Sequence, residues 1–273
     1  MNVQPPRTNA EAPNPQLPVV QRIRVRYAKR GRLRFTSHRD IGRAVERAVR
    51  RAGLPVAFSH GYHPHPRISY AGAAPTGAAS EAEYLELGLT APLDPDAVRL
   101  ALDEALPAGI DILTAVAASG AGLADRLAAS DWEITLVGVP LDAAQAAISA
   151  FAARPEVLVS RMTKKGLRTF DCRAAVVSIS AHAASTADPP GPCAILRVVL
   201  RHGVPSVRPD DVLAGLLEVA GLRAAVPPLL NRRMQGPLDH ETGTVGDPFV
   251  LDRDTPAATS AADVDRGGAA DPH

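Results

Sequence analysis

Apolar and basic side chains alternate between residues 22 and 35, which predicts a β-strand with one apolar side and one cationic side. After a turn or bulge at 29–31, Leu33 and Phe35 continue the apolar side. We therefore expect the apolar side to pack in a core and the cationic side to face something else. The first part alternates Ile23, Val25 and Tyr27 with Arg22, Arg24 and Arg26.

The next segment repeats its apolar residues with the period of an α-helix. Ser37 precedes the pattern and Asp40 follows three residues later, which resembles a capping box with Asp in place of Glu and places an acid at the helix start. Gly53 and Pro55 predict its end. The apolar stripe is Ile41, Ala44, Val45, Ala48, Val49 and Ala52, and the opposite side carries Arg39, Arg43, Arg47 and Arg50, one per turn.

The rest of the chain predicts the element order β-α-β-β-α twice. Both halves suit helices packed on one face of an antiparallel sheet, with the other face open. We therefore predict an α+β protein with two tandem ferredoxin-like halves, at 20–118 and 130–226. The further strands are expected at 56–59, 68–71, 84–89, 110–117, 132–139, 157–162, 169–182 and 193–202, and the further helices at 95–106, 141–153 and 209–220.

The two ends of the chain lack a regular pattern. Residues 1–19 are polar and rich in proline, which predicts disorder. Regularity fades after about Pro227, and residues 237–273 hold eight acidic residues against Arg253 and Arg266, a net charge of −6. We expect this segment to be a disordered acidic tail that keeps the protein soluble or competes with nucleic acid for a basic face.

Composition limits the class of protein. The chain is 46% hydrophobic and 4% aromatic, and it has two cysteines and a net charge of +1. It has no run of eighteen apolar residues, so we expect no membrane span, and the N-terminus has no secretory signal pattern. Two cysteines exclude a disulfide framework and a cysteine zinc cluster. These features favour a cytoplasmic protein without a cofactor.

Basic charge is concentrated in one stretch. Residues 20–70 hold thirteen basic residues against Asp40 and Glu46, a net charge of +11. Like charges one helical turn apart cost stability, so such a face suits an anionic partner, and arginine suits phosphate. We favour nucleic acid over another anion or a merely solvated surface. The candidate nucleic-acid-binding residues are Arg34, Arg39, Arg43, Arg47, Arg50 and Arg67, with a second basic patch at Lys164, Lys165 and Arg168.

A histidine-rich loop follows the basic helix. His60, His63 and His65 lie within six residues, and three interpretations stay open for them: a metal site, acid–base chemistry on RNA with Tyr62 or Lys165, or a structural or phosphate-contacting role. The candidate catalytic residues are His38, Asp40, Tyr62, His63 and His65. Glu81 and Glu83 are expected to pair with arginines, and the small-residue loop 72–80 is a weak candidate for close approach to a phosphate backbone.

Five motifs resemble a known family. They are FTSHRD at 35–40, RAVERAVRRAGLPVAFS at 43–59, HGYHPHPRIS at 60–69, GAASEAEYLEL at 77–87 and TKKGLRTFDCR at 163–173. Together they resemble the radical-SAM-linked proteins with a DUF2344-type domain, which occur alone or as an appendage of a radical SAM protein. The chain has no CxxxCxxC motif, so any radical chemistry would belong to a partner. Tyr62 and His63 depart from the Phe and Asn that the family usually shows.

These features predict an RNA-binding accessory protein for RNA modification or processing, acting on tRNA or rRNA with a separate radical SAM enzyme. In one composite site, Arg43 and Arg47 would hold phosphates while His38, His63 and His65 contact the base or sugar. Two alternatives stay open: a metal-independent RNA-processing enzyme that uses the histidine loop, and a protein adaptor that binds no RNA.

Overall fold

A computed structural model describes residues 17–60, 62–163, 166–184 and 191–254. The predictions for 1–16 and 255–273, and those for Lys164 and Lys165, lie outside these residues. Among the described helices, none is long and apolar enough to cross a membrane.

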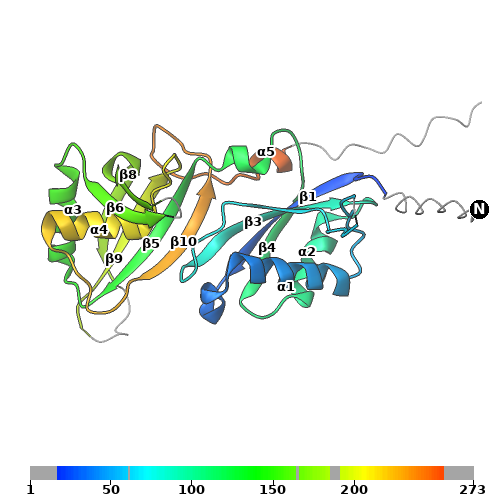
Figure 1. Cartoon of the computed structure of the whole chain (residues 1–273), viewed down its shortest axis with the longest axis horizontal. Helices are drawn as coiled ribbons and strands as arrows, with labels where there is room; N and C mark the ends of the chain where they lie inside the picture. Colours follow the sequence, from blue (N-terminus) through cyan, green and yellow to red (C-terminus); the bar gives the residue numbers. More distant parts are fainter. Residues whose placement is uncertain (1–16, 61, 164–165, 185–190, 255–273) are drawn as a thin grey trace, which may run out of the picture.

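The first half is a sheet covered on one face by two helices (Figure 1). Its strand order is β4-β1-β3-β2, all antiparallel, and the apolar sides of α1 and α2 pack on β1, β3 and β4. The elements are β1 (Gln21–Lys29), η1 (Gly31–Phe35), α1 (His38–Arg51), β2 (Ile68–Ala71), β3 (Ala79–Leu89), α2 (Pro95–Ala105) and β4 (Ile110–Ala117).

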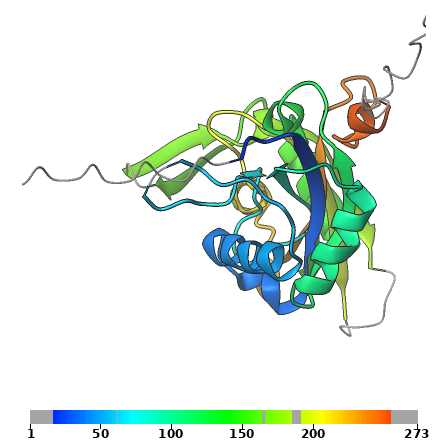
Figure 2. The same cartoon turned by 90° about the vertical axis from the view of Figure 1, so that its right-hand side faces the viewer.

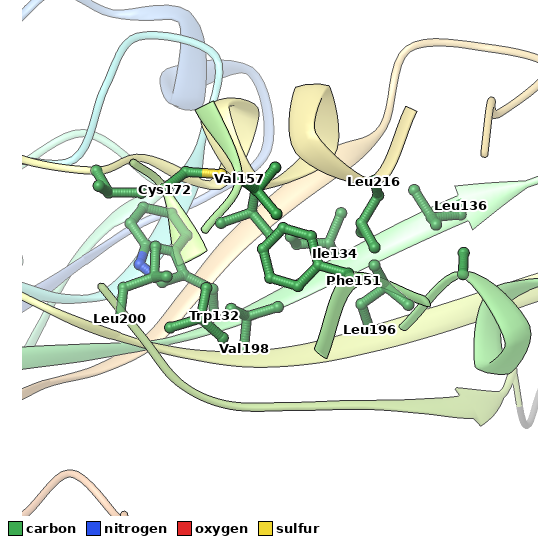
Figure 3. Close-up of a cluster of buried hydrophobic side chains, with 14 of the residues drawn as sticks. Trp132, Ile134, Leu136, Phe151, Val157, Cys172, Leu196, Val198, Leu200 and Leu216 are labelled. Atoms are coloured by element: carbon green, nitrogen blue, oxygen red, sulfur yellow. The ribbon is translucent and has the colours of Figure 1, made fainter. Parts of the chain in front are cut away.

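The second half repeats this arrangement with an extra hairpin. Its strand order is β10-β5-β9-β8, again antiparallel, and α3 and α4 pack over it. Trp132, Phe151 and Leu216 meet in its core (Figure 3). The elements are η2 (Leu123–Arg126), β5 (Ala129–Val137), α3 (Leu141–Ala152), β6 (Leu158–Thr163), β7 (Gly166–Asp171), η3 (Arg173–Ala175), β8 (Val176–Ala183), β9 (Cys193–Arg201), α4 (Pro209–Ala220), β10 (Leu229–Gly236) and α5 (Val250–Arg253).

The two sheets join through one short parallel contact. Asn231 of β10 pairs with Ala79 of β3, and Arg232 pairs with Ser80, so the eight strands form one mixed and mainly antiparallel sheet. The loop before β3 reinforces this junction, because Ala74 and Ala78 pack in the core of the second half.

Several local predictions were wrong. The apolar pattern after β1 does not continue the strand: Gly31 has a φ of +55°, residues 31–35 form η1, and Phe35 is exposed. Residues 56–59 make only isolated bridges, Val56 to Leu89 and Phe58 to Pro66. The segment 169–182 is divided by η3 between β7 and β8, because β6 and β7 form a separate hairpin.

The described chain beyond Pro227 contains the strand β10 and the short helix α5, whereas we expected regularity to fade there. β10 forms the second half's contact with the first, and residues 237–254 fold over the face of the first half opposite α1 (Figures 1 and 2). Phe249 is fully buried in a cluster with Tyr84, Val116 and Leu127. The described part of the expected acidic tail is therefore a structural cover. It covers apolar surface of the sheet that we had expected to stay open.

Candidate nucleic-acid interface

Helix α1 places four arginines on an exposed face. Ile41, Val45 and Val49 are buried against the sheet, and the four arginines lie on the opposite side of the helix. Among the described residues they have one acidic partner, Asp40, whose Oδ1 lies 3.4 Å from Arg43 Nη1. We call this surface the α1 arginine face; it consists of Arg39, Arg43, Arg47 and Arg50.

The arginines of strand β1 are arranged differently, and our expectation that they face a partner was wrong. Arg24 is 2% exposed and pairs with Glu86 at 3.0 Å and with Asp252 at 2.8 Å. Arg22 pairs with the same Glu86, and Arg26 donates to the carbonyl oxygen of Glu81 at 2.7 Å. Acidic partners distant in sequence therefore neutralise most of this side, whereas the arginines on the outer side of α1 stay exposed.

Asp252 is the centre of the buried charge network. Its carboxylate accepts from Arg24, from Arg126 Nη1 at 2.9 Å and from the backbone N–H of Ser119 at 2.8 Å. Burial opposes ionisation of Asp252, but these hydrogen bonds and the Arg24 charge outweigh it and hold its pKa below the usual value. This residue ties α5 to β1 and to η2.

The start of α1 is built as predicted. Ser37 caps the helix, since its Oγ accepts from the backbone N–H of Asp40 at 3.2 Å and donates to the Asp40 carboxylate at 2.7 Å. His38 is exposed and packs edge-to-face on Tyr70, with 5.1 Å between ring centroids. Asp40 therefore has a capping role, and His38 lies beside the sheet.

Replacing Ser37 with Ala tests this cap. The free energy of unfolding should fall by about 1 kcal/mol, because the N–H of Asp40 loses its acceptor. Urea unfolding followed by circular dichroism measures the change. Ser69→Ala, at an exposed position of β2, is the control and should stay within about 0.5 kcal/mol of the parent. Equal midpoints for both variants would contradict the capping role.

The histidine loop is closed at its base and exposed at its tip. The backbone N–H of Ser59 donates to the carbonyl of His65 at 2.8 Å, and Ser59 Oγ accepts from the N–H of His65 at 3.0 Å. Tyr62 and His63 are exposed. Within the described residues, no hydrogen bond or ring contact joins a loop histidine to His38, and no group of three or more metal-ligand side chains gathers. The composite site that we expected stays a prediction.

The other sequence-derived candidates are scattered. Arg34 stacks on Phe35, with its guanidinium carbon 4.4 Å from the ring centroid, and Arg67 is exposed. Arg168 is exposed on β7 of the second half, away from α1 (Figure 1). In the loop 72–80, Ala74 and Ala78 pack in the core of the second half, while Gly72, Ala73 and Thr76 are exposed. Arg168, the described member of the second basic patch, is thus separate from the α1 arginine face.

Sequence reasoning missed a polar cluster at the junction. Arg232 is 3% exposed, and its guanidinium donates to Glu83, to Ser80 and to the carbonyl oxygen of Gly72. Lys29 is buried nearby, and burial lowers its pKa although the charge of Glu83 opposes this. Glu81 and Glu83 do pair with arginines, as expected, the first with Arg30.

A cavity of about 350 Å³ lies beside this cluster, lined by Trp132, Ser130, His202 and Arg232 among others. His202 Nδ1 lies 2.7 Å from the carbonyl oxygen of Leu127, so it donates. Trp132 Nε1 donates to Ser130 Oγ at 2.8 Å, which leaves the Ser130 hydroxyl to donate to His202 Nε2 at 3.2 Å. This network uses a neutral imidazole, and burial lowers the pKa of His202 accordingly. The sequence gives no signal for it, because its members lie far apart in the chain.

Comparison with known proteins identifies a family and distant structures. Residues 22–209 match the family described as "Uncharacterized protein conserved in bacteria (DUF2344)". No curated protein matches the chain. A chain of the "Crystal Structure of a Cbf5-Nop10-Gar1 Complex" is 14% identical, with a TM-score of 0.41, over 83% of this chain and 55% of that one. An unknown protein from Galdieria sulphuraria is 16% identical, with a TM-score of 0.22, over 78% of this chain and 98% of that one. Likeness at this level carries no argument about function.

Proposed function

Because the chain belongs to the DUF2344 family, whose description assigns no activity, we propose its function from its own surface: it binds RNA through the α1 arginine face. The observation that carries the proposal is the contrast between α1 and β1. The arginines of β1 are occupied by Glu86, Asp252 and backbone carbonyls, whereas those of α1 are exposed and have a single acidic neighbour among the described residues.

The spacing of these side chains suits a phosphate backbone. Residues three or four apart on a helix lie about one 5.4 Å turn from each other, so four arginines form a row. Like charges in such a row repel one another, and an anionic partner relieves this repulsion. When the partner is a nucleic acid, the arginines also displace the cations condensed on its phosphates. RNA supplies a row of phosphates, which a small anion does not.

We further propose that the protein is a cytoplasmic accessory factor for modification or processing of tRNA or rRNA, working with a radical SAM enzyme. The resemblance of the five sequence motifs to radical-SAM-linked proteins supports a radical SAM enzyme as the partner. The two cysteines, Cys172 and Cys193, are too few for an iron–sulfur cluster motif, so the radical chemistry would reside on that enzyme.

Each half is, in our proposal, a ferredoxin-like unit. The element order β-α-β-β-α-β and the strand orders β4-β1-β3-β2 and β10-β5-β9-β8 support this assignment, with the β6–β7 hairpin as an insertion. In the first unit, α1 follows the first strand and lies on the outer surface, where a long ligand can reach it.

The proposal is tested by the double substitution Arg43→Ala/Arg47→Ala. RNA binding should weaken by about 1–3 kcal/mol, and the slope of log K against log salt should become shallower by about one for each lost phosphate contact. Fluorescence anisotropy with labelled tRNA and with rRNA fragments measures both quantities. The salt range is about 50 to 200 mM, over which an interface with many phosphate contacts loses about 10³–10⁵-fold in affinity.

The matched control removes the same charge from the second half. Arg201→Ala/Arg223→Ala replaces two exposed arginines outside α1 and should leave both the affinity and the salt slope close to those of the parent. If the two double variants bind alike, the α1 arginine face is only a solvated surface and the proposal fails. Incubation of the parent with the same RNAs separates binding from catalysis, because only an enzyme yields products.

A further inference from the structure

The aromatic side chains are distributed unevenly over the surface. The chain has ten Phe, Tyr and Trp residues, and seven of them are buried or half-buried. The three exposed ones are Phe35, Phe58 and Tyr62, with exposed fractions of 59%, 37% and 99%. In the chain, Phe35 lies three residues before α1, and Phe58 and Tyr62 lie seven and eleven residues after it. A protein with so few aromatic residues thus places every exposed one within eleven residues of this helix.

Phe35 and Tyr62 flank α1 at opposite ends. Phe35 lies two residues before the cap of α1, and the carbonyl of Arg34 accepts from Gly77, close to where β3 begins. The histidine loop is anchored where β3 ends, because the N–H of Ala57 donates to Gly88. The two ends of α1 are therefore separated by about the length of β3. The eight residue steps from Ser80 to Gly88 span about 26 Å of this strand. The fourteen residues of α1 span about 21 Å, so α1 covers most of the distance between the two aromatic ends.

Neither aromatic ring is explained by packing. Phe35 belongs to no apolar cluster, although the sequence pattern placed it on the apolar side of a strand. Arg34 covers one face of its ring at 4.4 Å and brings a positive charge to it. Tyr62 projects from the loop tip and is almost completely exposed. A solvent-facing ring next to free cations matches what unpaired nucleobases require, since every base presents an aromatic face.

We propose that the α1 arginine face takes unpaired RNA, a single strand or a loop, with bases stacking on Phe35 at one end and on Tyr62 at the other. This inference rests on the proposed function and narrows its ligand class. Duplex RNA keeps its bases stacked inside the helix and offers only phosphates and 2′-hydroxyls to a surface of this kind, so the rings would contribute nothing to binding it. The length of α1 suits a site of about four nucleotides, the lower end of the range for single-strand-binding folds.

The test compares unpaired with paired RNA on the full chain. Anisotropy is measured with a labelled single-stranded 12-mer (about three times the expected site) and with a blunt duplex of the same length at one salt concentration. The single strand should bind at least about ten-fold more tightly. Phe35→Leu and Tyr62→Leu should each weaken single-strand binding roughly ten-fold, with an unchanged salt slope and unchanged duplex binding. Tyr62→Phe, which keeps the ring, should bind like the parent.

The outcomes distinguish base stacking on Phe35 and Tyr62 from RNA binding by the α1 arginine face. If Arg43→Ala/Arg47→Ala weakens binding while both leucine variants bind the single strand like the parent, RNA binding stands and stacking is refuted. A duplex bound as tightly as the single strand also refutes it. If the parent binds neither RNA, the proposed function fails and the inference fails with it. Both rings are exposed, so the leucine variants should fold, and circular dichroism checks that they do.

Discussion

Replacing Asp252 with Ala should lower the free energy of unfolding by about 3–5 kcal/mol. The carboxylate is shared by Arg24 and Arg126, whose side chains are 3% and 8% exposed, and its own side chain is fully buried. Without it, the buried Arg126 loses its acidic partner and Arg24 keeps only Glu86, and the N–H of Ser119 loses the carboxylate that it donates to at 2.8 Å. Urea unfolding at pH 7 measures the loss.

The control for Asp252 lies two residues along the chain. Asp254→Ala removes an exposed carboxylate next to the same helix, and it should change the free energy of unfolding by no more than about 0.5 kcal/mol. Similar losses in the two variants would mean that net charge, and not the buried network, is responsible.

At acidic pH, the free energy of unfolding of the parent should approach that of Asp252→Ala. The pKa of Asp252 is held below that of an unfolded aspartate, so its stabilising contribution is complete above about pH 4 and is lost as the pH falls through the folded-state pKa. The difference between the two unfolding free energies should therefore be largest near neutral pH and should shrink at lower pH. A constant difference across that range would contradict the ionic role of this carboxylate.

The substitution Glu83→Gln should have a comparable effect at the junction, about 3–5 kcal/mol. Glu83 and Arg232 are 3% exposed, and Lys29 is equally buried. The neutral amide keeps the shape of the side chain but leaves two buried cations without an anion. Because β3 and β10 pair through only two residue pairs, we also expect the two halves to unfold less cooperatively in this variant.

Two further variants test whether the stability loss in Glu83→Gln comes from the buried cations that it leaves unpaired. Glu81→Gln, two residues away, breaks a partly exposed pair with Arg30 and should cost less than about 1 kcal/mol. Adding Arg232→Gln to Glu83→Gln removes one of the stranded cations, so the double variant should lose less than the sum of the two single losses. Additive losses would show that the two side chains act independently. Chemical unfolding followed by Trp132 fluorescence reports on this region, since Trp132 lies beside Arg232.

Local pattern predicted much of the first half. Helix α1 begins after Ser37 and ends before Gly53, as its cap and glycine indicated, and β4 has the predicted bounds. Strand β10 was missed because Arg232 and Arg233 interrupt its apolar pattern. The sequence cannot show that Arg232 is neutralised by an acid 149 residues away. Periodicity reports local burial, whereas such partners depend on the tertiary arrangement.

The same limit shaped the prediction of the interface. Two adjacent basic elements looked equivalent in the sequence, yet β1 is neutralised and α1 is not. Phe35 was assigned to the core because its spacing continued the alternation of β1, while a positive φ at Gly31 turned the chain out of the strand. The exposed aromatic residue beside α1 became visible only once this turn was known.

The pairing of Arg24 with Asp252 also orders events during synthesis. The two residues are 228 positions apart, so the ribosome completes β1 long before Asp252, the second acidic partner of Arg24 besides Glu86, emerges. Synthesis proceeds at about 5–20 residues per second. For some tens of seconds, therefore, Arg24 lacks Asp252 and the apolar surface around Tyr84 is exposed. The nascent first half therefore cannot complete its buried charge network or cover Tyr84 until Phe249 and Asp252 have left the exit tunnel.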